Sequence, residues 1–298
     1  DHGEPDVITA WRTTPGHHAR GAFNPREIET IRREVLPSLP CEQAEIGIIS
    51  PYNEQVNALH RELGGGVDVA TVHKFQGREK EAIILSTVDD QITAFTDDPN
   101  LLNVAVSRAK RQFTLVTSSN EQPNSRNIAD LLAYIDYNGG KITESAIHSV
   151  FDMLYEPYAE ARRAFLKRHR RISEFDSENL TYALLERVLE ADPVFQHLGV
   201  LCHQPLRQLI RDWTLLDDEE RRYASNGATH LDFLIYNRVS KRPVETDGYR
   251  FHKQGTRQSE RDRMKDRILN RYSLPLLRLS TTGTDEEAKI KDQLSKIV

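Results

Sequence analysis

The sequence predicts an α/β fold in two domains, a parallel sheet covered by helices and then a second, smaller α/β domain. With 298 residues, the chain is long enough for two ordinary domains. Up to about residue 120, helical patterns alternate with short apolar runs, which is typical of parallel strands covered by helices. A second such series begins after residue 176, behind a polar and charged stretch. We therefore expect domains at 1–122 and 177–298, joined by a helical connector at 123–176.

In the first domain, apolar residues at helical spacing predict two helices, at 24–39 and 53–63. The glycines at 64–66 end the second helix, since glycine readily takes the backbone conformation of a helix C-cap. Runs rich in β-branched residues predict buried strands at 44–50, 67–72, 81–88 and 113–119. This order of elements predicts the layered α/β domain.

The connector and the second domain have their own pattern. Residues 128–140 predict a short helix closed by glycines, and the charged residues up to about 176 have a helical pattern. In the second domain we expect helices and strands in alternation. The helices are at 178–190 and 258–271, the strands at 230–237, 242–249 and 274–280, and a strand or loop at 199–210.

Charge and composition limit the class of protein. A composition of 38% hydrophobic and 29% charged residues excludes a membrane-embedded protein. The net charge of −5 does not exclude nucleic acid as a partner, because binding depends on where basic residues cluster. Residues 162–171 contain six Lys or Arg and no acid. This run is either a helix that follows a phosphate backbone or a solvated helix face balanced by nearby acids.

The cysteines and the N-terminus predict the cellular setting. Cys41 and Cys202 are far apart and too few for a disulfide framework or a four-cysteine zinc site, so we expect thiols in a reducing compartment, the cytoplasm. No apolar run reaches the length of a membrane span, and the first residues have no secretion-signal pattern, so we expect no membrane partner. The chain does not start with Met, which favours a processed product or a piece of a longer chain.

Three segments carry the functional signal of the first domain. SPYNEQV (50–56) follows a buried strand, TVHKFQGREKEAIILS (71–86) joins two strands through a polar loop, and NVAVSRAKRQFTLV (103–116) leads a helix into a strand. In this order they resemble motifs IV, V and VI of the second RecA-like domain of superfamily 1 helicases. The resemblance covers roughly residues 20–120 and is strongest to the branch that contains the nonsense-mediated-decay helicase.

The resemblance implies a role for each of these residues. Arg108 would be an arginine finger, placing a permanent charge on the γ-phosphate during ATP hydrolysis, and its alternative is a surface ion pair. The motif V loop would couple nucleotide to the bound strand, and motif IV would also contact nucleotide. These ATP-binding candidates are Gln76, Gly77, Arg78, Glu79 and Gln55; the nucleic-acid-binding candidates are Tyr52, Thr71, His73 and Lys110. Val56 stands where some relatives have a second arginine finger.

A missing motif limits what the chain does alone. The sequence has no G-x-x-x-x-G-K-[ST] loop to cradle phosphates and no acidic strand end to hold magnesium beside such a loop. We therefore expect no ATP hydrolysis by this chain by itself. ATP would bind jointly with a first RecA-like domain, located upstream in a longer protein or supplied in trans.

Acidic residues on two predicted strands mark the second domain. Asp232 lies on one strand, and Glu245 and Asp247 lie two apart on the next, so the last two point to the same face. Asp232 and Glu245, together with the carbonyl of Thr246, suit one or two Mg²⁺ or Mn²⁺ ions that activate water for phosphodiester cleavage. The alternative is a structural acidic cluster balanced by nearby arginines.

This pattern resembles the PD-(D/E)xK nuclease superfamily, of the restriction-endonuclease type, over about residues 176–280. It is most similar to the branch near the very-short-patch-repair endonuclease, which includes bacterial domains of unknown function. The resemblance implies that Asp232 and Glu245 bind metal and that Glu178 is an outer acid. It also implies that His252 and Lys265 act on a proton or a phosphate. Asp247 stands where the superfamily usually has lysine, and Lys265 is the candidate to replace it.

Basic residues surround these acids and would attract a phosphate backbone. They include the DNA-binding candidates Lys241, Arg250 and Lys253. Arg263, Asp262 and Arg278 complete the family signature, and their alternative role is to hold the helix onto the sheet.

Together these resemblances predict a helicase-nuclease that acts on single-stranded or forked DNA, with translocation 5′ to 3′ implied by the helicase family. DNA repair and defence against foreign DNA are both compatible roles. Two alternatives stay open: a helicase with a catalytically degenerate DNA-binding module, and an RNA helicase.

Overall fold

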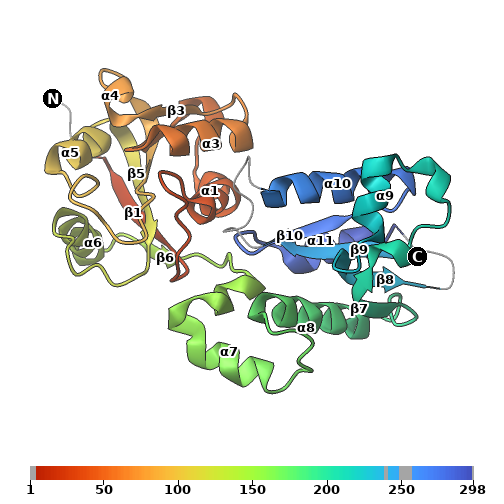
Figure 1. The fold of residues 1–298 in the computed structure, drawn as a ribbon. Helices are drawn as coiled ribbons and strands as arrows, with labels where there is room; N and C mark the ends of the chain where they lie inside the picture. The colour runs from red at the N-terminus through yellow and green to blue at the C-terminus, as the bar shows by residue number, and fades with distance from the viewer. Residues whose placement is uncertain (1–4, 238–240, 248–256, 297–298) are drawn as a thin grey trace. The chain divides into compact units, whose positions relative to one another are not determined.

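The computed structural model describes residues 5–237, 241–247 and 257–296, with backbone alone at 241, 242, 245–247 and 257–259. The chain divides into two compact units, at Asp1–His148 and Ser149–Val298. Each unit has its own sheet (Figure 1). The α/β fold class with two sheet-containing domains is thus confirmed, whereas the predicted three-part division stays a prediction.

The first unit is built on a six-stranded, all-parallel sheet in the order β3-β2-β4-β5-β1-β6. The strands are β1 (Val7–Thr13), β2 (Ile46–Ser50), β3 (Asp68–Thr71), β4 (Lys80–Ser86), β5 (Ala109–Ser118) and β6 (Ile142–Glu144). The central strands are buried on both faces, which explains why they are continuous apolar runs in the sequence.

Helices cover both faces of this sheet (Figure 1). On one face, Ile83 and Leu85 of β4 pack in a cluster with residues of α4 (Val72–Phe75), α5 (Pro99–Ser107) and α6 (Asn127–Tyr137). On the other face, Ala82 and Ile84 pack with α3 (Asn53–Leu63) and with the first helical segment. The two sets of β4 residues alternate, as the two-residue period of a strand requires.

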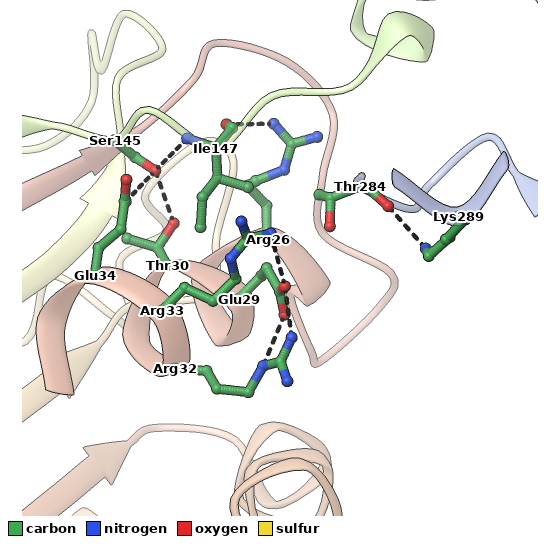
Figure 2. Close-up of polar contacts among 10 residues, drawn as sticks. All are labelled: Arg26, Glu29, Thr30, Arg32, Arg33, Glu34, Ser145, Ile147, Thr284 and Lys289. Atoms are coloured by element: carbon green, nitrogen blue, oxygen red, sulfur yellow. Dashed lines mark hydrogen bonds and ion pairs between the residues drawn. The ribbon is translucent and has the colours of Figure 1, made fainter. Parts of the chain in front are cut away.

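The first helical segment runs through α1 (Pro25–Thr30), the π-helical η1 (Ile31–Val35) and α2 (Leu36–Ser38). It is tied to the residues that follow β6 (Figure 2). Arg26 donates to the carbonyl of Ile147 at 3.0 Å, and Ser145 donates to Glu34 at 2.6 Å. These bonds explain why the first unit extends to residue 148, although residues 123–148 lie in the predicted connector.

The second unit has a mixed four-stranded sheet in the order β10-β9-β8-β7. β7 (Gly199–Pro205), β8 (His230–Tyr236) and β9 (Lys241–Asp247) are antiparallel neighbours, and β10 (Leu277–Ser280) pairs with β9 in parallel. One face of the sheet packs on α8 (Asp176–Ala191) and α11 (Glu286–Leu294), and the other on α9 (Asp218–Ser225) and α10 (Arg257–Arg271).

Short helices precede and connect these elements. They are η2 (Gln43–Glu45) in the first unit, and η3 (Val150–Leu154), η4 (Glu156–Tyr158), α7 (Ala159–Leu166), η5 (Leu206–Gln208) and η6 (Trp213–Leu215) in the second. No helix among the described residues is long and apolar enough to cross a membrane.

The structure differs from the sequence predictions in a few elements. β1, β6, α9 and α11 have no counterpart among the predicted elements. The basic run at 162–171 is only half helical, because α7 ends at Leu166 and the remaining basic residues form a turn and a loop. Local patterns missed these elements because their stability comes from packing partners that are distant in the sequence.

Candidate functional site

Most of the ATP-binding candidates gather where β4 and β5 begin. Arg108 ends α5 directly before β5, and its carbonyl accepts a hydrogen bond from the backbone nitrogen of Lys80 at 3.1 Å. The loop Gln76–Glu79 leads into β4 and therefore lies beside Arg108. Gly77 has a φ of +81°, a conformation that side chains disfavour, so this turn requires glycine.

The basic side chains in this region have different hydrogen-bond and ion-pair partners. The Nε atom of Arg108 is buried and has no hydrogen-bond partner in the part of the chain that the structure describes, and its Nη2 is 3.4 Å from Ser107 Oγ. Arg78 instead pairs with Asp68 of β3 at 3.1 Å. Lys110 is exposed and lies 3.7 Å from Glu81. Arg108 therefore keeps hydrogen-bonding capacity for a ligand, whereas Arg78 is engaged within the domain.

A pocket of about 210 Å³ joins the nucleic-acid-binding candidates Thr71 and His73 to Gln76. Two further lining residues were not predicted: Phe95, whose side chain is 54% exposed, and Asn100 of α5. The ring of Tyr52 lies 5.4 Å from the ring of Phe95. Polar groups and exposed aromatic rings are what a single strand requires for stacking and backbone contacts.

Tyr52 is held by the loop that follows β4. Its hydroxyl donates to Asp89 at 2.9 Å, and burial raises the pKa of this hydroxyl. Asp89 also accepts from Thr96 at 2.6 Å, next to Phe95. The Asp89 carboxylate thus fixes both aromatic residues at the edge of the pocket.

Gln55 lies in a buried polar network rather than on the surface. It is fully buried, accepts from the backbone nitrogen of Asn24 at 2.8 Å, and donates to Ser86 at 2.8 Å. Because both ends of the amide are engaged, Gln55 connects α3 to β4. A direct nucleotide contact would require breaking one of these bonds.

The centre of this network is Glu27, which sequence reasoning missed. Its carboxylate is fully buried and accepts from Ser86 Oγ at 2.5 Å, from Thr87 Oγ1 at 3.0 Å and from the backbone nitrogen of Val88 at 3.0 and 3.1 Å. Burial raises the pKa of Glu27 to about 8. Val88 has a φ of +74°, which is strained for a β-branched residue. Glu27 and Asn24, which donates to the Val88 carbonyl at 2.9 Å, hold this strained residue in place.

In the second unit, four polar side chains from three elements come together. Glu178 of α8 has a buried Oε2 atom that lacks a hydrogen-bond partner among the described residues. His203 of β7 places its Nε2 atom 3.8 Å from Glu178 Oε2, and the ring of His230 in β8 lies 5.6 Å from the ring of His203. Burial raises the pKa of Glu178, and the nearby Asp232 carboxylate adds to this rise, whereas a Ser173 hydrogen bond and the two histidines oppose it.

Strand register brings the predicted metal ligands to adjacent strands. Phe233 pairs with Val244, so one step along the antiparallel pair places Asp232 opposite Glu245. Glu245 is also the partner of Arg278 in β10. The side chains of Glu245, Thr246 and Asp247 lie outside the described residues, as do the side chain of Lys241 and all of Arg250, His252 and Lys253.

The backbone is irregular beside Asp232. His203, which faces Asp232 across the β7–β8 register, has a φ of +49°. Leu231 packs in one core cluster and Phe233 in the other, although residues two apart on a strand normally face the same side. The alternation of side chains between the two faces of β8 is therefore interrupted at Asp232. Strained residues of this kind gather at functional sites.

Lys265 and the signature residues lie on α10. Lys265 donates to the carbonyl of His230 at 3.0 Å, so its ammonium group is beside the strand that carries Asp232. Arg278 donates to Asp266 at 2.9 Å and lies 3.9 Å from Asp262, which ties α10 to β10.

Whether this site can hold a metal ion depends on the ligand atoms that surround it. In the described part of the chain, no group of three or more His, Cys, Asp or Glu side chains could hold a metal ion. The Glu178 oxygen without a partner and the Asp232 carboxylate are suitable ligand types, and the register adds Glu245 as the third. The set is therefore chemically suited to Mg²⁺ only when Glu245 is part of it.

His203, His230 and Phe95 were missed by sequence reasoning. The two histidines lie 27 residues apart and have no motif spacing, although HLD (230–232) places one of them two residues from Asp232. Phe95 lies in a loop without any periodic pattern. Proximity to a recognised acid is the only signal that could have found His230.

The first unit is thus an α/β lobe with an all-parallel sheet and a pocket beside one end of its strands. Residues 9–120 match the family model described as an AAA domain. Relatives that match this chain include an uncharacterised ATP-dependent helicase of Methanocaldococcus jannaschii, 38% identical over 33% of this chain and 15% of the relative. These matches support an ATP-dependent helicase domain.

Two further relatives match parts of the chain. DNA-binding protein SMUBP-2 of Rattus norvegicus is 30% identical over 45% of this chain and 14% of its own length. ATP-dependent helicase upf1 of Schizosaccharomyces pombe is 40% identical over 27% of this chain and 9% of its own length. The chain spans between 5% and 15% of the length of the curated relatives it matches.

The second unit and one solved structure complete the comparison. Residues 175–297 match a family model described as a protein of unknown function. A solved structure of the C-terminal domain of a possible DNA helicase from Lactobacillus plantarum WCFS1 aligns with a TM-score of 0.35 at 18% identity, covering 47% of this chain and 87% of that one.

Proposed function

We propose that this chain combines the second RecA-like lobe of an ATP-dependent DNA helicase with a metal-dependent nuclease domain. The observation that carries the nuclease half is the buried oxygen of Glu178, which has no hydrogen-bond partner among the described residues and lies beside His203. A buried carboxylate oxygen without a hydrogen-bond partner is unfavourable unless a ligand or a proton uses it. The helicase half is supported by the helicase relatives and by Arg108.

In the motor, Arg108 acts as an arginine finger. Its Nε atom is buried without a partner in the described part of the chain, so the guanidinium can turn to a γ-phosphate without losing a hydrogen bond to that atom. ATP binds between this lobe and a lobe that carries the phosphate-binding loop, in the same longer protein or in trans. Thr71 and His73, with Phe95, contact the nucleic acid strand.

In the nuclease domain, Asp232 and Glu245 are the residues that hold Mg²⁺ or Mn²⁺. An ion held there would supply an activated water and would stabilise the leaving oxygen of the phosphodiester. Glu178 keeps a proton more readily than an exposed glutamate, because burial raises its pKa, and His203 lies beside it with its Nε2 atom 3.8 Å from Glu178 Oε2. Lys265 offers its ammonium group to the cleaved phosphate in place of the lysine that Asp247 replaces.

Cleavage of labelled single-stranded, duplex and forked DNA by this chain, with Mg²⁺, Mn²⁺ or EDTA, tests the nuclease. We expect metal-dependent cleavage that falls at least about 100-fold in Asp232→Ala and in Lys265→Ala. Asp292→Ala is the matched control, because this acid is exposed and pairs only with the surface residue Lys296 among the described residues. Binding of DNA without cleavage by the parent chain, in every metal, would support the degenerate binding module instead.

Matched DNA and RNA strands distinguish the two nucleic acids. Among the relatives, one is named as a DNA-binding protein and another as the helicase upf1. We expect tighter binding and cleavage of DNA. A consistent preference for RNA would contradict the DNA helicase proposal while leaving the ATP-dependent lobe intact.

A further inference from the structure

A cationic groove of about 340 Å³ lies in the second unit, and none of its lining residues is an acid of the proposed nuclease. Five of its lining residues are basic and one is acidic: Arg162, Arg163, Lys167, Arg170, Arg171 and Asp176. They come from α7, from the loop that follows it and from the first turn of α8. Such a concentration of positive charge is unfavourable unless a polyanion neutralises it.

The groove has a fixed shape because a buried side chain holds its loop. Asn179 of α8 is 2% exposed and accepts from the backbone nitrogens of Ile172 at 2.8 Å and Ser173 at 3.1 Å. It also donates to the carbonyls of Ser173 at 2.9 Å and Phe175 at 3.0 Å. With four bonds from one amide, the backbone that carries Arg170 and Arg171 is ordered before any ligand binds.

Most of these cations have no internal counter-charge. Arg162 pairs with Asp176 at 3.2 Å and donates to the carbonyl of Met153, so it belongs to the wall of the groove. Arg163 lies 4.0 Å from Glu160, whose side chain is 96% exposed, and a surface pair of this kind is weak. No carboxylate among the described residues forms an ion pair with Lys167, Arg170 or Arg171.

An exposed aromatic residue lies one position before the groove in the chain. Phe175 is 57% exposed and directly precedes Asp176, one of the lining residues. A large apolar ring in water next to a row of cations is the combination that binds a single strand, because bases stack on the ring while phosphates meet the cations. An anionic membrane surface would use the charges but not a single aromatic ring at a groove.

We propose that this groove is a second nucleic-acid-binding site, which holds the backbone of single-stranded DNA and stacks a base on Phe175. The loop connects the groove to the proposed nuclease centre, since the Ile172 carbonyl, next to Arg171, lies 3.2 Å from His203 Nε2. The loop that carries the basic residues of the groove thus contacts a residue of the proposed nuclease centre. The inference does not require cleavage, so its test is made without metal.

The test is the affinity of the full chain for a fluorescein-labelled thymidine 20-mer in EDTA, titrated over salt concentration. The variant Arg163→Gln/Lys167→Gln/Arg170→Gln removes three cations of the groove. We expect at least a 10-fold loss of affinity at 100 mM salt, and a salt dependence reduced by about 2 in slope, since each phosphate contact on a single strand contributes about 0.7. Phe175→Ala is expected to weaken binding at least 5-fold without changing the slope.

The matched control is Arg207→Gln/Arg211→Gln/Arg222→Gln, which removes the same charge from exposed positions of the same unit outside the groove. It is expected to change affinity less than 3-fold. Both triple variants are also made in a Thr71→Ala/His73→Ala background, so that the first unit cannot conceal the effect. Arg163→Lys/Arg170→Lys keeps the charge and should retain the parent slope, which separates lost charge from misfolding.

Three outcomes would overturn the proposal: parent-like binding by the groove variant, equal losses in the groove and control variants, and a loss confined to vesicles of anionic lipid while DNA binding is unchanged. DNA binding in EDTA that depends on the groove, with no cleavage in any metal, would leave this inference standing and remove the nuclease proposal. The experiments therefore distinguish a failure of the groove proposal from a failure of the nuclease proposal.

Discussion

Two glutamates, one in each unit, have similar chemistry and opposite surroundings: Glu27 is fully buried, whereas the Glu178 side chain is 16% exposed. Glu27 accepts hydrogen bonds from two hydroxyl groups and a backbone nitrogen, and the loop after β4 depends on it. Glu178 has one buried oxygen with no partner among the described residues, and a Ser173 hydrogen bond, an aspartate and two histidines influence its pKa. Burial raises the pKa of both groups. The comparison shows that burial alone does not identify a reactive acid. What distinguishes the two glutamates is how many hydrogen-bond donors reach their carboxylate oxygens.

The largest expected effect is on catalysis and separates the two acids directly. Glu178→Gln keeps the size of the side chain but cannot carry a proton or a charge, so we expect metal-dependent DNA cleavage to fall by about 100-fold or more. Glu27→Gln should leave cleavage within a factor of 3. Glu190→Gln, an exposed acid on the same helix, is the control for helix α8. Cleavage by Glu178→Gln at the parent rate would place this residue among structural acids like Glu27.

The second effect is on stability and runs the other way. Glu27→Ala leaves Ser86, Thr87 and the backbone of Val88 without their buried acceptor, which is expected to cost about 3 to 4 kcal/mol. Glu178→Ala is expected to change the unfolding free energy by less than about 1 kcal/mol, because its buried oxygen makes no hydrogen bond within the described residues. Hydrogen exchange followed separately in α1 and α8 measures each unit. Equal losses would contradict the contrast between the two sites.

The third effect is on the pH dependence of the first unit. Because burial raises the pKa of Glu27 to about 8 from 4.5, the folded state keeps a proton that the unfolded chain releases. This contribution is fully present below pH 4.5 and is lost as pH rises through about 8, so the free energy of unfolding decreases by a few kcal/mol across that range. Urea unfolding of the parent between pH 5 and 9 should show the decrease, and Glu27→Gln should remove it. A parent profile with the same slope as the variant would show that Glu27 ionises in the folded protein.

The smallest effects contrast helix ends in the two units. Gly64 ends α3 with a φ of +70°, whereas Ser273 follows α10 with a φ of +53° in a turn closed by the Leu274 nitrogen and the Leu269 carbonyl at 3.0 Å. Ser273→Gly removes the strain and should stabilise the second unit by about 0.5 to 1 kcal/mol. Gly64→Ala should destabilise the first unit by about 1 kcal/mol. Thermal unfolding of both variants measures whether stability rises in Ser273→Gly and falls in Gly64→Ala. A lower stability of Ser273→Gly would mean that the serine side chain stabilises the turn by more than its backbone strain costs.

The sequence alone determined the elements whose signals are local. α3 at Asn53–Leu63 coincides with its prediction because both its apolar face and its terminating glycine are written within a dozen residues. The strands β2 and β4 were readable as continuous apolar runs because both of their faces are buried. Asp232 and the loop Gln76–Glu79 were candidates because their neighbours in the sequence formed recognisable motifs.

The tertiary structure decided everything that depends on distant partners. β1 pairs with β5 about a hundred residues later, and no local pattern encodes such a pairing. Glu27 became the centre of a network, and Glu178 the neighbour of His203, only when helices and strands from separate segments packed together. Donors and acceptors are supplied by whichever atoms the fold brings within about 3 Å, so Glu27 has both oxygens hydrogen-bonded, whereas Oε2 of Glu178 has no partner among the described residues.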